Sequence, residues 1–144
     1  MLTVEMIREH IQDYPEKNRL LCEYEFSDDE ICIAIRGATS QYNTYPPHHI
    51  RLQESFPDNF NELMMQGTLA KMFRGKAFQQ FRNQLNFQDG GASGGLNDKG
   101  QPYSQLAENL QAKFRANCLT LKKSINYGDG FGEIGSDYIS LPFY

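Results

Sequence analysis

The stretch DNFNELMMQGTLAKMFRGKAFQQFRNQLN, residues 58–86, decides the fold of this 144-residue chain. It contains no proline and only two glycines, and nearly all of its residues tolerate a helix. A helix of this length would extend roughly 40 Å. Its first half is apolar nearly all round, so we expect other helices to surround it, while its second half is amphipathic. One predicted apolar side consists of Phe60, Leu63, Gly67, Ala70, Ala77, Phe78, Phe81 and Leu85.

Arg74 interrupts this apolar side, next to Phe78. In one interpretation its aliphatic stem packs on the domain while the guanidinium reaches an edge or an acid such as Asp89. In the other, the surface around Arg74 faces a neighbouring chain, where a fork-shaped donor suits a carboxylate or a carbonyl. Lys71 and Arg82 lie in the same sector, which makes it a weakly basic strip flanked by aromatic residues.

Three further helices are predicted. Val4, Ile7 and Ile11 indicate a short amphipathic helix over residues 3–14, which Pro15 stops. Ser27-Asp28-Asp29-Glu30 fits a capping box and predicts a helix over 28–42, in which Gly37 suggests close packing against another backbone. Apolar residues at helical spacing predict a last helix over 103–124, with Lys122 and Lys123 at its C-terminal end, where cations are favoured.

Glycine-rich segments follow the two long helices. Asp89, Gly90 and Gly91 open an excursion over residues 87–102 that we expect to form a hairpin or a compact loop. Residues 127–144 are too rich in glycine to continue the last helix, yet too aromatic for a disordered tail. We therefore expect an extended arm that lies on the chain's own helices or crosses to a partner through its apolar residues, among them Tyr127, Phe131, Tyr138, Leu141, Phe143 and Tyr144.

The predicted fold is therefore mostly α. Residues 1–126 form a small bundle of about four helices with a long central helix and the glycine-rich excursion, and residues 127–144 form the extended C-terminal arm. An irregular loop over 43–57 joins the second helix to the long one.

The charge distribution argues against nucleic-acid binding. The formal net charge is −4, and residues 1–56 hold five Lys/Arg against ten Asp/Glu. The remaining segments are close to neutral, so no segment has the basic excess that phosphate backbones require. Cys22, Cys32 and Cys118 are widely spaced and fit small buried hydrophobes in a reducing compartment. No segment has the apolar length of a membrane span or a signal peptide, so we expect assembly inside a cell.

No catalytic or metal-binding pattern emerges from the sequence. His48-His49 suggests a ligand or a base, but adjacent side chains point apart and no third ligand lies nearby. The glycines after Asp89 and those around Asp129 lack the strand–turn–helix context of a phosphate loop. We therefore expect a protein that is not an enzyme, without catalytic residues, cofactor or metal.

Several phrases resemble the small head-to-tail connector, or neck adaptor, proteins of tailed phages, those of crAss-like phages among them. These are FSDDEI, the helix MMQGTLAKMFRGKAFQQFRNQL, QDGG after it, NDK before the last helix, and LKKSINYGDGFGEIGSDY. The resemblance spans residues 20–144 and consists of element order and short phrases. The loop that contains Pro46-Pro47-His48-His49 has no counterpart in it.

The resemblance implies a virion structural protein that is assembled in the host cytoplasm. It implies a homo-oligomeric ring of about twelve copies, contacts with the portal and with other neck or tail proteins, and double-stranded DNA passing through the ring without specific binding. Mild acidity suits that passage, because a negative wall repels DNA phosphates. The interface residues would then include Arg74, Arg82, Asp89, Gly90, Gly91 and the apolar residues of the arm named above. The alternative is a non-viral adaptor or regulatory domain that binds a protein through the same arm.

Overall fold

The computed structural model describes residues 2–18, 22–48, 50–53, 56–83, 85–89, 92–96 and 99–131, and within 85–89, 92–96 and 129–131 it describes the backbone alone. Four α-helices account for most of the described chain, namely α1 (Val4–Ile11), α2 (Asp28–Thr44), α3 (Asn61–Arg82) and α4 (Gly100–Phe131). A short 3-10 turn, η1 (Asp58–Phe60), leads into α3. Strands β1 (Leu85–Asp89) and β2 (Ala92–Leu96) pair antiparallel between α3 and α4. The fold is thus a mostly α, small helical bundle, as the sequence predicts.

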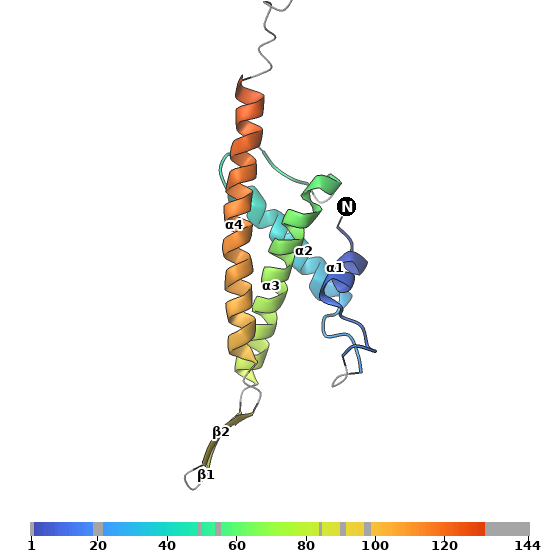
Figure 1. Cartoon of the computed structure of the whole chain (residues 1–144), viewed down its shortest axis with the longest axis vertical. Coiled ribbons are helices and arrows are strands. Elements are labelled where there is room, and N and C mark those ends of the chain that lie inside the picture. The colour runs from blue at the N-terminus through green and yellow to red at the C-terminus, as the bar shows by residue number, and fades with distance from the viewer. Residues whose placement is uncertain are drawn as a thin grey trace, which may run out of the picture.

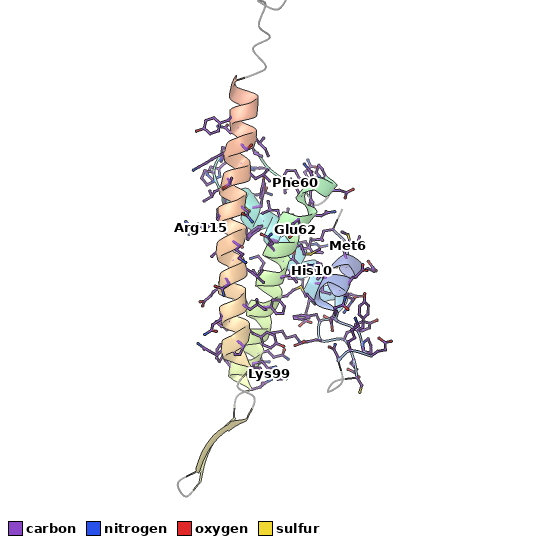
Figure 2. The ribbon with its side chains drawn as sticks, in the orientation of Figure 1. Met6, His10, Phe60, Glu62, Lys99 and Arg115 are labelled. Atoms are coloured by element: carbon purple, nitrogen blue, oxygen red, sulfur yellow. The ribbon has the colours of Figure 1, made fainter. Side chains whose placement is uncertain are left out.

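The two longest helices, α3 and α4, run antiparallel along most of their length (Figure 1). Figure 2 shows Phe60, at the start of α3, and Lys99, just before α4, at opposite ends of this pair. The β-hairpin lies beyond the end of the pair at which Lys99 lies. Helix α2 crosses the pair, and α1 lies on the outer side of α2. The excursion is therefore a hairpin that continues the direction of the two helices.

Gly67 determines how closely α3 and α4 approach. A Cβ atom at Gly67 would lie 2.8 Å from the ring of Phe114, which is fully buried. Beside this contact, the Asn117 side-chain amide donates to Gln66 Oε1 at 2.9 Å. Further along, the rings of Phe73 and Tyr103 stack with centroids 5.9 Å apart. These contacts set one antiparallel register for the pair.

The first half of α3 is enclosed over most of its surface, as its composition predicts, although Glu62 is exposed. Its buried residues are Leu63, Met64, Met65, Gly67, Thr68, Leu69, Ala70 and Met72. The second half differs from the prediction, because Phe78 and Phe81 are exposed and only Ala77 of that side is buried. Arg74 is exposed as well. Phe78 borders open space on two sides, a groove towards α2 and a depression towards α4.

Helix α2 begins with the capping box that the sequence predicts. The backbone N–H of Glu30 donates to Ser27 Oγ at 3.3 Å, and the N–H of Ser27 donates to Glu30 Oε2 at 2.8 Å. The expectation that Gly37 packs against another backbone is wrong. The side chain of Lys71 occupies the space instead, with its Cδ 2.8 Å from where a Cβ of Gly37 would lie. A flexible lysine stem fills this crossing.

A buried ion pair holds the N-terminal segment to α2. Arg8 donates from Nη1 to Asp13 Oδ2 at 3.1 Å and from Nη2 to the Phe26 carbonyl at 2.9 Å and to Asp28 Oδ1 at 2.5 Å. Asp13 also accepts the backbone N–H groups of Glu25 and Phe26. Arg8 and Asp13 are almost fully buried. The sequence analysis missed this network, since neither residue breaks a helical pattern.

Several element ends differ from the predicted ones. Helix α1 ends at Ile11, because Gln12 adopts a left-handed conformation with φ 57° and its N–H returns to the Arg8 carbonyl. The predicted 58–86 helix ends at Arg82, and Leu85 begins β1. The expectation that glycines end the last helix before residue 127 is wrong, because α4 continues to Phe131. A glycine costs about 1 kcal/mol in a helix, which weakens it without breaking it. Of the predicted arm, residues 132–144 lie outside the described residues.

Two glycines of α3 give a matched stability test. We expect Gly67→Ala to be destabilising by about 1–2 kcal/mol, because the clash with the Phe114 ring outweighs the gain in helix propensity. A Cβ at Gly75 meets nothing within 4 Å, so Gly75→Ala should be stabilising by about 0.5–1 kcal/mol. Urea denaturation of both variants measures the difference. Equal effects at the two positions would contradict the close α3–α4 approach.

The two acids that contact Arg8 give a second matched test. Asp13→Asn removes the buried partner, and we expect it to cost about 3 kcal/mol of unfolding free energy because it leaves Arg8 buried and undercompensated. The side chain of Asp28 is 75% exposed, so Asp28→Asn should cost less than about 1 kcal/mol. Urea denaturation measures both. If Asp28→Asn proved the more damaging variant, the exposed contact would be the dominant one.

Candidate interaction surface

An open groove runs between α2 and the second half of α3. Its volume is about 810 Å³, and Ile33 and Phe78 line it. These two apolar side chains are 67% and 68% exposed. Gly75 also lines the groove, and a Cβ atom at this position would meet nothing within 4 Å, so the groove is open along this part of α3. Two large apolar side chains that share one groove indicate a contact surface more strongly than scattered ones do.

Basic side chains surround this groove. Lys71, Lys76 and Arg82 line it, against the single acid Glu30. The Lys76 ammonium lies 5.0 Å from the centroid of the Phe26 ring, so it stays close to the groove wall. Burial lowers the pKa of Lys71, and the nearby Arg74 guanidinium lowers it further. The lining of the groove is thus partly apolar and mainly positive in charge, in a chain of net charge −4.

The structure separates Arg74 from Arg82. Arg82 lines the α2–α3 groove, whereas Arg74 lines shallow depressions between α3 and α4 together with Glu108. One of these depressions, of about 450 Å³, also involves Ala112 and Arg115 of α4. Figure 2 shows Arg115 on the side of α4 that faces away from α3. The predicted basic strip is therefore divided between two neighbouring surfaces of α3, and Phe78 lines both of them.

The other predicted interface residues lie at the two ends of the helical pair or outside the described residues. Asp89 ends β1, and its side chain is not among those described. Tyr127 is 62% exposed on α4, and Phe131 is the last residue of that helix. Outside the described residues lie Gly90, Gly91, Tyr138, Leu141, Phe143 and Tyr144.

A buried polar cluster at the C-terminal half of α4 was missing from the sequence analysis. Lys122 is fully buried, and its ammonium donates to the carbonyls of Tyr45 at 2.5 Å and Pro47 at 3.3 Å. It also lies 4.5 Å from the centroid of the Tyr42 ring. The prediction that Lys122 serves the helix end is wrong, because α4 continues past it. Its role is to hold the loop after α2 against α4.

Tyr42 and Cys118 complete this cluster, and both are fully buried. Burial raises the pKa of the Cys118 thiol to about 12, against the opposing effect of the Lys122 ammonium. Burial also raises the pKa of Tyr42 to about 12, with a further contribution from Cys118. Burial lowers the pKa of Lys122. Within the described part of the chain, the Tyr42 hydroxyl has no hydrogen-bond partner.

The described histidines and the other two cysteines are at the surface. His10 and His48 are exposed, and His49 lies outside the described residues. Cys22 and Cys32 are exposed, so the expectation of three buried cysteines holds for Cys118 alone. The described residues contain no group of three or more His, Cys, Asp or Glu that could hold a metal ion. They also contain no helix long and apolar enough to cross a membrane.

The raised thiol pKa predicts a loss of stability in alkali. Above pH 9 the unfolded chain loses the Cys118 proton while the folded chain keeps it, so the unfolding free energy falls as pH rises toward 12. Cys118→Ala should remove about 1 kcal/mol of the fall between pH 8 and pH 10. The pKa of Lys122 is lowered, which has the opposite effect on the pH dependence of stability. The effect of Cys118 is therefore isolated by comparing the unfolding free energies of wild type and variant, measured by urea denaturation at each pH. Exposed Cys32 supplies the control, and equal slopes for wild type and Cys118→Ala would contradict the prediction.

Comparison with known proteins does not place this chain in a family. No protein-family model, no curated protein and no solved structure matches it. The fold and the surfaces described above therefore rest on the chain's own geometry, and the resemblance to neck proteins remains an expectation from short phrases of sequence.

Proposed function

We propose that this chain is a structural protein of a tailed-phage virion, a subunit of the head-to-tail connector ring that joins the portal to the tail and surrounds the passing genome. The proposal rests on one observation, namely that two elements project from opposite ends of the α3–α4 pair. A β-hairpin extends it at one end, and α4 extends it at the other (Figure 1). Such a subunit can contact one neighbour at each end.

The hairpin supports assembly on energetic grounds. Its two strands pair only with each other among the described residues, in the register Leu85↔Leu96 to Asp89↔Ala92. An isolated two-stranded hairpin is at best marginally stable in water, and its open edges are templates for further pairing. A hairpin that projects beyond its bundle therefore gains stability from a partner surface.

The extension of α4 supports the same proposal. Helix α4 has 32 residues and α3 has 22. The C-terminus of α3 and the N-terminus of α4 both lie at the hairpin. The additional turns of α4 therefore project past the start of α3, where Tyr127 is exposed. The charge is also suitable, because a chain of net charge −4 presents little attraction to DNA phosphates that pass through a ring.

Assembly tests the proposal directly. We expect native mass spectrometry and negative-stain microscopy of the purified chain to show closed rings of about twelve copies, alone or after addition of the portal protein encoded beside it. An unrelated soluble protein added in place of the portal protein should induce no rings. The proposal fails if the chain stays monomeric in both mixtures, or if its gene lies away from portal and capsid genes. In the latter case a protein-binding adaptor becomes the better interpretation.

A further inference from the structure

We propose that the groove between α2 and α3 binds residues 138–144 of a second copy of this chain. The inference rests on the proposed function, because both require copies of the chain to associate, and it specifies one contact between them. Four properties of the described residues support it, namely the exposed apolar walls, the surrounding charge, the length of the groove and the position where α4 ends.

The apolar walls suit the composition of the segment. Ile33 and Phe78 are each about two-thirds exposed, and Gly75 keeps the space between the helices open. Residues 138–144, YISLPFY, carry five large apolar or aromatic side chains. Burial of such side chains contributes about 25 cal/mol per Å² of apolar surface, which makes this segment a strong candidate for an apolar groove.

The charges of the two surfaces are complementary. Lys71, Lys76 and Arg82 surround the groove and only Glu30 opposes them. Residues 132–144 contain Glu133 and Asp137 and no Lys or Arg. The acidic residues 132–137 and the apolar residues 138–144 thus match a groove whose lining is both basic and apolar. Such complementarity fixes the orientation of the segment and makes its binding sensitive to salt.

The lengths also agree. The α3 residues that line the groove run from Lys71 to Arg82, which is about 16 Å along a helix. An extended segment of five or six residues spans roughly the same distance. Residues 138–144 can therefore lie along the whole groove.

The chain's own segment cannot occupy the groove in this way. Phe73 stacks on Tyr103 and Gly100 lies against the Phe81 ring, so the groove is level with the first turns of α4. From there α4 runs to Phe131, which places its end about 30 Å or more from the nearer edge of the groove. Seven further residues span at most about 25 Å, so Tyr138 of the same chain does not reach the groove. The last few residues of the same chain come within reach of the nearer edge alone, so a segment that fills the whole groove must come from another copy.

Two complementary variants of the full chain test the proposal. Phe78→Asp damages the groove at an exposed position, and Leu141→Asp damages the segment. Each alone should reduce the association constant at least tenfold in sedimentation or native mass spectrometry, with unchanged circular dichroism. An equimolar mixture should recover 1:1 dimers, because one intact segment meets one intact groove and no second segment–groove contact can form. Leu106→Asp, at an exposed apolar position of α4 outside the groove, should associate like wild type.

A synthetic peptide of residues 132–144 makes the test independent of spontaneous assembly. It should bind the full chain saturably and more weakly at high salt, and Phe78→Asp in the chain or Leu141→Asp in the peptide should weaken binding at least tenfold. Absence of peptide binding, or wild-type association of the Phe78→Asp variant, overturns the proposal. Rings that survive Phe78→Asp would refute the groove contact and leave the neck function standing. Peptide binding without rings and without phage genes nearby would support the groove contact and refute the neck function.

Discussion

The close approach of α3 and α4 at Gly67 is the contact on which the rest of the fold depends. With no side chain at this position, the Phe114 ring enters the interface and is fully buried. Tyr45 then packs edge-on to the same ring, with centroids 6.4 Å apart, and its carbonyl accepts from Lys122. One glycine thus sets the separation of the two long helices, and the ring that it admits positions the loop after α2.

The difference in length between the two long helices gives the molecule its two distinct ends. Because Gly100 lies against Phe81, both helices meet at the hairpin and all the additional length of α4 projects at the other end. Lys122 anchors the lower part of this projection to the carbonyls of Tyr45 and Pro47. The projection is therefore rigid near the bundle and exposed beyond it, which suits a contact element.

The sequence predicts the features that depend on local chemistry. The Ser27–Glu30 capping box and the enclosed first half of α3 follow from residue type and spacing, and the structure confirms both. The sequence does not predict features that depend on where other elements lie. Phe78 has the spacing of a core residue, yet no helix covers it. Arg8 and Asp13 have the pattern of surface residues, yet the returning chain at Phe26 buries them.

The helical pattern of the sequence does not distinguish the exposed Phe78 of α3 from the buried residues beside it. A helical wheel places Phe78 beside Ala77, but Ala77 is buried next to Ala107 of α4 whereas Phe78 borders an open groove. Ile33 and Phe78 are both exposed in this one groove, and two large apolar side chains that share a groove indicate a contact surface. The basic side chains that line the groove favour a partner with negative charge. A second copy of this chain, with a net charge of −4, is such a partner. The proposed self-association would use Phe78, the same residue whose spacing made the second half of α3 resemble core in the sequence.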